Sequence, residues 1–243
     1  MKNFSNLYIF SFASVLVIIV ATLLSFVAEQ LKPLQERNVE IEKKLDILRS
    51  VDMTAGIEEA ENRSTFIEEL FANNISESFV VNSKGELIDG RDAFAIAKEL
   101  KAEMQMPLEE RGLPIFVASD PEAGNRYIVP VLGKGLWGPI WGYIAINDDY
   151  NTLSGTVFAH AAETPGLGSE INTDKFMDPF KGKKLFDESG NFVSVTVVKG
   201  GAEPNDPHGV DAISGGTITC KALEKMLWDC LNPYVNYFKK QMN

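Results

Sequence analysis

Cysteine and histidine are both scarce in this chain, with two of each among 243 residues. Two cysteines are too few to ligate a 2Fe–2S or 4Fe–4S cluster. No Cys or His has the spacing of a metal site. Cys220 and Cys230 lie ten residues apart on one predicted helix, about 15 Å along its axis, which is beyond disulfide reach. We therefore expect no metal site and two cysteines that pack in the core.

Positive charge is also in deficit, with 23 Lys and Arg against 34 Asp and Glu and a formal net charge of −11. Nucleic-acid binding needs basic stripes, so we expect no nucleic-acid partner. The sequence has no Gly-x-Gly-x-x-Gly fingerprint, no P-loop and no recognisable Ser-His-Asp arrangement. We therefore expect neither NADH binding by this chain nor a catalytic residue of its own.

Only one long uncharged run is present, the 22 residues 7–28 that follow the short N-terminal tail 1–6. A helix of this length spans the hydrocarbon core of about 30 Å. A cleaved signal peptide is the rival interpretation, but its apolar core is usually about 7–15 residues long. Phe26-Val27-Ala28 is also a poor cleavage site. The run predicts a retained transmembrane helix.

Residues 29–50 continue the helical pattern and predict a stalk, with Pro33 tolerated near a break. Basic residues such as Lys32 and Arg37 follow the span, which by the positive-inside rule favours a cytoplasmic C-terminal domain. However, these charges are interleaved with glutamates, and large domains translocate largely regardless of charge. The residues alone leave the orientation open.

Residues 51–243 are sufficient for one large globular domain, and their pattern predicts an α+β fold with an antiparallel or mixed sheet and flanking helices. The expected elements are helices at 54–71 and 92–101, a hairpin of 79–82 with 86–88, strands at 115–118, 127–132, 140–147 and 155–161, and a second hairpin of 184–187 with 192–199. A final helix is expected to start after Thr217 and to be interrupted at Pro233.

Residues 211–217 read Asp-Ala-Ile-Ser-Gly-Gly-Thr and directly precede that final helix. A Thr hydroxyl can form a phosphoester, and two glycines allow a tight turn and the close approach of a bulky group. Thr217 is expected at or just before a helix N-terminus, where free N–H groups and a partial positive charge suit a phosphodiester. An ordinary Ser/Gly/Thr turn that caps a helix is the alternative.

A second motif, Glu-Thr-Pro-Gly-Leu-Gly, occupies residues 163–168. Pro165-Gly166 fits the central pair of a type II turn, which needs positive φ at its second residue. Such a loop can aim backbone N–H groups and one apolar side chain at a planar ring. His160 lies close by and is expected to hold position rather than to catalyse.

Together these motifs resemble those of a known family. Residues 211–217 resemble the D-x-x-[ST]-G-A-[ST] signature at which a flavin transferase esterifies FMN phosphate, with Gly216 where the family usually has Ala. With 163–168, they resemble the FMN-binding domain shared by NqrC of the sodium-translocating NADH:quinone reductase and RnfG of the Rnf ferredoxin:NAD oxidoreductase. G-K-G-L-W at 133–137, G-K-K-L-F-D at 182–187 and V-V-K-G at 197–200 favour the first complex.

The resemblance implies FMN attached covalently through a phosphoester to Thr217, within a flavin lobe at about 115–243. It implies recognition by the flavin transferase of Asp211, Ser214, Gly215 and Gly216. The implied cofactor-binding residues are Trp137, Glu163, Thr164, Leu167, Gly168, Lys199, Ser214 and Gly215. Two of these have an alternative: Trp137 could pack in the core, and Lys199 could simply be solvated.

The resemblance also implies a function. The chain would be a one-electron carrier in a complex that reduces a quinone such as ubiquinone with NADH and transports sodium. Its partners would be the membrane itself and the other membrane, flavin and iron–sulfur subunits of that complex (A, B, D, E and F). The domain at 51–243 would face the periplasm from the bacterial inner membrane. The alternatives are an RnfG-type subunit and a non-flavinylated scaffold subunit.

Overall fold

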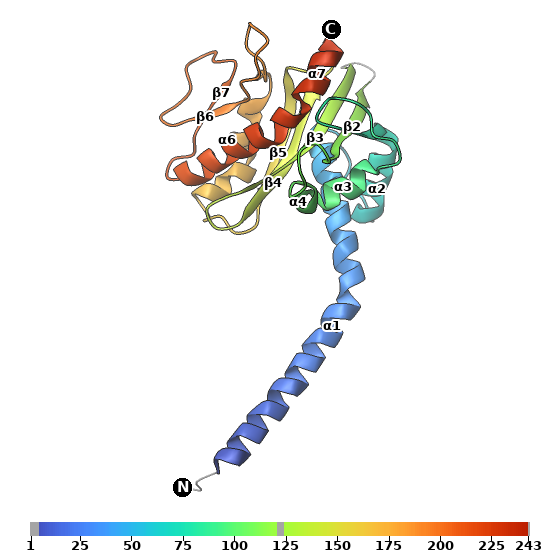
Figure 1. Cartoon of the computed structure of the whole chain (residues 1–243), viewed down its shortest axis with the longest axis vertical. Coiled ribbons are helices and arrows are strands. Elements are labelled where there is room, and N and C mark those ends of the chain that lie inside the picture. The colour runs from blue at the N-terminus through green and yellow to red at the C-terminus, as the bar shows by residue number, and fades with distance from the viewer. Residues whose placement is uncertain (1–4, 121–123, 243) are drawn as a thin grey trace. The chain divides into compact units, whose positions relative to one another are not determined.

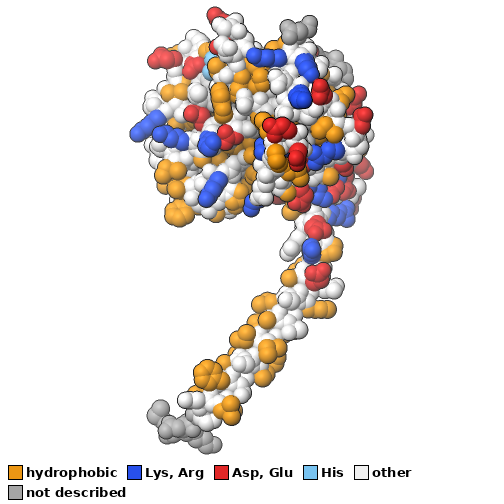
Figure 2. Space-filling view, viewed as in Figure 1, with side chains coloured by type: hydrophobic (Ala, Val, Ile, Leu, Met, Phe, Trp, Pro, Cys, Tyr) orange, Lys and Arg blue, Asp and Glu red, His pale blue; other side chains and the backbone are white. Residues whose placement is uncertain are grey.

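The computed structural model describes residues 5–120 and 124–242 and begins with one long helix. Helix α1, Asn6–Arg49, is continuous through Pro33. Its N-terminal part is long and apolar enough to cross a membrane and has no buried residue. Hydrophobic side chains cover that part in Figure 2, and charged ones begin further along the helix. The expected apolar span and the stalk are thus one continuous helix.

Two compact units make up the chain, Met1–Glu42 and Lys43–Asn243. The second contains a five-stranded antiparallel sheet in the order β1-β2-β3-β4-β5. Its strands are β1 Ile75–Val81, β2 Leu113–Asp120, β3 Gly124–Lys134, β4 Pro139–Asn147 and β5 Leu153–His160. The predicted α+β class is confirmed, and so are the four strands expected between 115 and 161.

Both faces of this sheet are covered, which is why the central parts of its strands are mostly apolar and buried (Figure 1). Successive side chains point to opposite faces, so the neighbours Ile115 and Phe116 belong to different buried clusters. One cluster includes α6, Thr217–Leu231, and α7, Val235–Met242. The other includes the end of α1 and helix α3, Ala93–Lys98.

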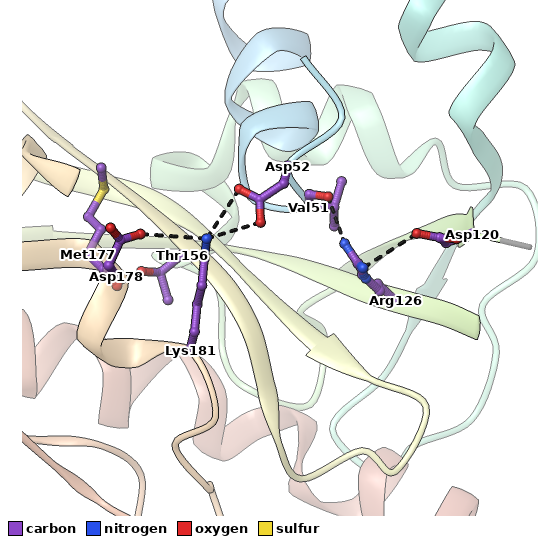
Figure 3. A network of polar contacts seen from close by, with 8 residues as sticks. All are labelled: Val51, Asp52, Asp120, Arg126, Thr156, Met177, Asp178 and Lys181. Carbon is purple, nitrogen blue, oxygen red and sulfur yellow. Dashed lines mark hydrogen bonds and ion pairs between the residues drawn. The ribbon is translucent and has the colours of Figure 1, made fainter. Parts of the chain in front are cut away.

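Polar contacts fasten the segment after α1 to the rest of its unit (Figure 3). The Arg126 guanidinium of β3 donates to the Val51 carbonyl at 2.7 Å and lies 3.5 Å from a carboxylate oxygen of Asp120. The Lys181 ammonium lies 3.0 Å from a carboxylate oxygen of Asp52 and 3.5 Å from one of Asp178. The lysine pairs are largely exposed, so we expect them to orient this turn more than to stabilise the fold.

The helix predicted at 54–71 forms, but it begins nine residues later than predicted, at Arg63. Helix α2 is Arg63–Asn74, and the Asn62 side chain caps it by accepting the Thr65 N–H at 3.2 Å. Gly56 has a φ of 83°, which no right-handed helix permits. The helix predicted at 92–101 forms as α3 and the short α4, Leu100–Glu103, with Asp92 as the cap of α3.

The structure confirms the turns of the two predicted hairpins but not the full extent of their strand pairing. Residues 82–86 make the expected turn, with the Asn82 N–H donating to the Glu86 carbonyl at 2.9 Å, but the extended partner of β1 is β2. The hairpin of 184–187 with 192–199 forms only near its turn, where Phe186 bridges Phe192, the Asp187 N–H donates to the Asn191 carbonyl at 2.9 Å and the Val193 N–H donates to the Leu185 carbonyl at 2.8 Å. Strand β6, Thr196–Val198, instead pairs in parallel with β7, Gly209–Asp211. A strand of three residues carries no local signal for the strand with which it pairs.

Short helices complete the unit. They are η1 Gly168–Asn172, α5 Asp174–Met177 and η2 Asp178–Phe180, which follow β5, and η3 Asn232–Tyr234, which separates α6 from α7. The final helix expected after Thr217 forms and begins one residue earlier, at Thr217 itself, and its predicted interruption at Pro233 is confirmed. Both predicted core cysteines, Cys220 and Cys230, are buried free thiols in α6. Burial raises the pKa of Cys230 to about 11.

Candidate functional site

The loop at 163–168 follows β5 and forms the predicted turn. The Leu167 N–H donates to the Thr164 carbonyl at 3.1 Å, and Gly166 has a φ of 75°. These are the properties of a type II turn with Pro165 and Gly166 at its centre. The Gly166 N–H donates to the Glu170 side chain at 3.1 Å, which ties the turn to η1.

The motif at 211–217 leads directly into α6, of which Thr217 is the first helical residue. Gly216 is the N-cap residue and offers no side chain to cap the helix. In the part of the chain that the structure describes, the backbone N–H groups of Thr217, Ile218 and Thr219 donate no hydrogen bond. This end of the helix is therefore an open cluster of donors with a partial positive charge.

The two motifs touch through Leu167 and Gly215. A Cβ placed on Gly215 would lie 2.6 Å from Cδ2 of Leu167, and Gly215 has a φ of 75°. Close approach and positive φ thus both favour glycine at this position. The loop at 163–168 is held against the start of α6 by this contact.

Glu163 links three segments from a buried position, since only 4% of its surface is exposed. One carboxylate oxygen accepts the Trp137 N–H at 2.9 Å, and the other accepts the Thr219 hydroxyl at 2.6 Å. The Glu163 N–H donates to Nδ1 of His160 at 3.2 Å. Burial acts to raise the pKa of Glu163, but hydrogen bonds from Thr219 and from the N–H groups of residues 136–138 outweigh it and lower the pKa.

Four large apolar side chains from these segments are exposed, and we call them the apolar rim: Leu136, Trp137, Leu167 and Ile218. Trp137 is 67% exposed, which excludes the interpretation of this residue as a core side chain. Leu136 and Trp137 are linked to the loop at 163–168 by the hydrogen bond from the Trp137 N–H to Glu163. Leu167 of that loop contacts Gly215, which directly precedes α6, and Ile218 lies in the first turn of α6. An aromatic and three aliphatic side chains can contact a planar ring.

The remaining predicted residues lie at the edge of this arrangement. Lys199 is exposed in the turn after β6 and contacts none of the rim residues among the described hydrogen bonds and ion pairs. Asp211 ends β7, and its carboxylate accepts the Ala202 N–H at 2.8 Å. Ser214 is exposed in the turn before α6.

Sequence reasoning missed the structural role of Thr219 and the exposure of Leu136 and Ile218. Thr219 is 2% exposed, and only the fold brings its hydroxyl to Glu163, 56 residues away. An apolar residue on each side of a motif carries no signal of its own, because most such residues are buried.

The donors and side chains present fit an FMN group. A phosphate suits the open N–H groups of α6, and Thr217 is a half-buried residue whose hydroxyl has no hydrogen-bond partner in the described residues. The exposed apolar rim suits a flavin ring. The chain thus contains both chemistries that a bound flavin mononucleotide needs.

Comparison with known proteins agrees with this chemistry. The family model of the FMN-binding domain matches residues 135–232, which include the loop at 163–168, the motif at 211–217 and α6. The class of domain is therefore an FMN-binding domain.

Curated relatives extend the match beyond this domain. NqrC of the Na(+)-translocating NADH-quinone reductase of Vibrio anguillarum is 32% identical over 222 residues, covering 85% of this chain and 83% of that protein. NqrC of Vibrio vulnificus strain YJ016 is 30% identical over 220 residues with the same coverage. The crystal structure of the same subunit from Parabacteroides distasonis is 40% identical, with a TM-score of 0.72, covering 86% of this chain and 96% of that one. The chain belongs to the NqrC family of Na(+)-translocating NADH-quinone reductase subunits.

Proposed function

We propose that this chain is a covalently flavinylated one-electron carrier, with FMN attached through a phosphoester to Thr217. The observation that carries the proposal is Thr217, a half-buried residue at the open N-terminus of α6 whose hydroxyl has no hydrogen-bond partner among the described residues. FMN supplies the electron-transfer chemistry, and the protein supplies attachment, orientation and electrostatics.

The surroundings of the three nearby hydroxyls favour Thr217 as the acceptor. Thr219 is buried, and its hydroxyl already donates to the Glu163 carboxylate at 2.6 Å. Ser214 is exposed but lies in the turn, three residues before the first residue of the helix. Thr217 alone combines access with the free N–H groups of the first turn of α6, which would hold the phosphodiester.

The apolar rim would then bind the ring system. Leu167 and Trp137 come from loops that Glu163 and Gly215 hold in place, so the backbone that presents these side chains is positioned before a ligand binds. Pre-positioned contacts reduce the entropy lost on binding. Thr164 and Gly168 shape the turn that presents Leu167, and Lys199 would reach the phosphate or the ribityl chain only from the edge of the site.

The proposal for partners follows the family. Relatives are named as a subunit of a Na(+)-translocating NADH-quinone reductase, so we propose that this chain relays electrons between cofactors of neighbouring subunits during quinone reduction coupled to sodium transport. The flavin transferase would be a further partner, with Asp211, Ser214, Gly215 and Gly216 as its recognition residues.

Intact-mass measurement tests the attachment. The full-length chain and its Thr217→Ala variant are expressed with a flavin transferase, and only the parent is expected to gain the mass of FMN and to fluoresce in a denaturing gel. Thr219→Val is the matched hydroxyl control and should keep the flavin. Retention of the mass increment by Thr217→Ala would refute the assignment, and its loss only in Thr219→Val would move the acceptor to Thr219.

A reporter fusion tests the orientation. We propose that the FMN-binding domain faces the periplasm, with α1 as its anchor in the inner membrane. A reporter joined after Asn243 should be active only outside the cytoplasm. Activity of a cytoplasmic reporter at the same position would mean that the positive charges after the apolar run set the topology.

A further inference from the structure

Three sequence motifs that are far apart in the chain meet at one carboxylate. Glu163 opens the loop at 163–168, accepts the Trp137 N–H of the 133–137 motif, and accepts the hydroxyl of Thr219 in the first turn of α6. Both of these contacts join residues that are far apart in the sequence, whereas the hydrogen bond from the Glu163 N–H to His160 is local. Glu163 therefore connects every segment that contributes to the apolar rim.

Two glycines leave space for this carboxylate. A Cβ on Gly135 would lie 2.5 Å from one oxygen of Glu163, and a Cβ on Gly168 would lie 2.6 Å from the other. Neither glycine has positive φ, so close approach is the reason for glycine at both positions. The glycines of two separate motifs thus serve the same side chain.

The carboxylate is a buried anion that no cation neutralises. Among the described residues, Lys, Arg and His form no ion pair with it, and its stabilising partners are the Thr219 hydroxyl and backbone N–H groups. These dipoles keep its pKa low against the effect of burial, so the group is charged at neutral pH. A buried charge held by fixed dipoles acts on its surroundings with little screening by water.

We propose that Glu163 is a positioning residue of the flavin site, whose buried carboxylate fixes the 133–138 turn against the start of α6. The same carboxylate places a negative charge behind the apolar rim, and this charge makes the bound flavin harder to reduce. This inference rests on the proposed attachment of FMN at Thr217. On reduction, one electron passes from the reductant, which is oxidised, to the flavin, and the ring gains negative charge. A fixed anion nearby opposes that gain.

Glu163 itself is not expected to touch the ring, because it is buried while the four rim side chains are exposed. Glu163→Gln separates charge from shape. The amide oxygen can still accept the Trp137 N–H, and the amide nitrogen can donate to the Thr219 hydroxyl, so both contacts are preserved without the charge. Glu163→Asp does the reverse, because it keeps the charge but shortens the reach by one methylene.

The experiment measures flavin midpoint potentials of the full-length, flavinylated protein by anaerobic titration with dithionite. Glu163→Gln should shift the potential to more positive values while intact mass shows an unchanged flavin content. Glu163→Asp should melt at a lower temperature but keep the parental potential. The control is Glu103→Gln, which neutralises another buried carboxylate, one paired with Arg91, and should leave the potential unchanged.

An unchanged potential in Glu163→Gln overturns the electrostatic part of the proposal. If Glu163→Gln fails to fold, the potential of Glu163→Asp tests the electrostatic part instead. A shifted flavin potential in this variant, which keeps the charge, would mean that geometry and not charge sets the potential.

Flavin-free protein tests the positioning part separately. In a Thr217→Ala background, Glu163→Ala should accelerate amide hydrogen exchange at Trp137 and at Cys220, the first hydrogen-bonded amide of α6, whereas Glu163→Gln should keep both protected. Unchanged exchange in Glu163→Ala would overturn positioning. If the parent chain itself gains no FMN mass, the proposed function fails, and this arm still reports on Glu163.

Discussion

Replacing Gly168 with alanine should drive apart the Glu163–Thr219 hydrogen bond. The added Cβ would collide with the Thr219 hydroxyl and lie 2.6 Å from a carboxylate oxygen of Glu163 and 3.0 Å from Cβ of Thr219. Gly168 is buried at the start of η1, so the methyl group cannot turn to solvent. One of the two partners must move, and the bond of 2.6 Å between them must lengthen or break.

The expected cost follows from these contacts. Overpacking a well-packed site costs about 1–3 kcal/mol, and a lost hydrogen bond to a charged group costs about 1.5–3 kcal/mol. Because the same displacement produces both effects, we take a combined loss of about 2.5 kcal/mol in the free energy of unfolding. For a domain of this size, 1 kcal/mol shifts the melting temperature by about 2–4 °C, so Gly168→Ala should lower it by roughly 5–10 °C.

Calorimetry on the flavin-free protein, with Thr219→Ala as a second substitution, tests whether the collision with Thr219 causes the loss of stability in Gly168→Ala. Thr219→Ala removes the colliding hydroxyl, so Gly168→Ala should cost less in that background, and the two effects should not add. Gly166→Ala is the matched control: its Cβ would meet nothing within 4 Å, and its cost arises only from a φ of 75°, so it should add fully to Thr219→Ala. Additive effects of Gly168→Ala and Thr219→Ala would refute the steric argument.

Further predictions concern the same loop, the helix cap and a buried acid. Gly166→Val should cost about 1–2 kcal/mol through its φ of 75° and alter the flavin absorption spectrum without preventing attachment, which intact mass and spectroscopy can check. Gly216→Ala should change stability by less than about 1 kcal/mol and keep the FMN mass increment, because φ is −95° and the new Cβ would lie 3.1 Å from Ile213. Burial acts to raise the pKa of Glu103, but Arg91 and the Gly112 N–H lower it overall. The stability from this acid is therefore present above pH 4.5 and lost as pH falls through the lowered pKa, so the melting difference between parent and Glu103→Gln should shrink below pH 4.5.

Much of the fold could be predicted because its signals are local. The uncharged run at 7–28 predicts an apolar helix from length and composition alone, and α1 contains it. Runs of apolar residues predict β2 to β5, and apolar residues at helical spacing predict α6, with Pro233 ending it. The turn at Pro165-Gly166 follows from the allowed dihedral angles of two residues.

Only the tertiary structure decided which residues meet. Strand β6 pairs with β7 because the fold brings these two segments together. Trp137 is exposed, although an isolated tryptophan fits a core equally well.

At the candidate site, the sequence by itself determined the motif residues, including the hydroxyl at Thr217 and the glycines around it. It did not determine that Glu163 is buried, that it accepts a hydrogen bond from Thr219, or that Gly135 and Gly168 make room for it. Those facts depend on side chains that lie 26 and 56 residues away along the chain. Dihedral preferences and hydrophobic periodicity act over a few residues, whereas the position of a buried charge depends on every segment that packs around it.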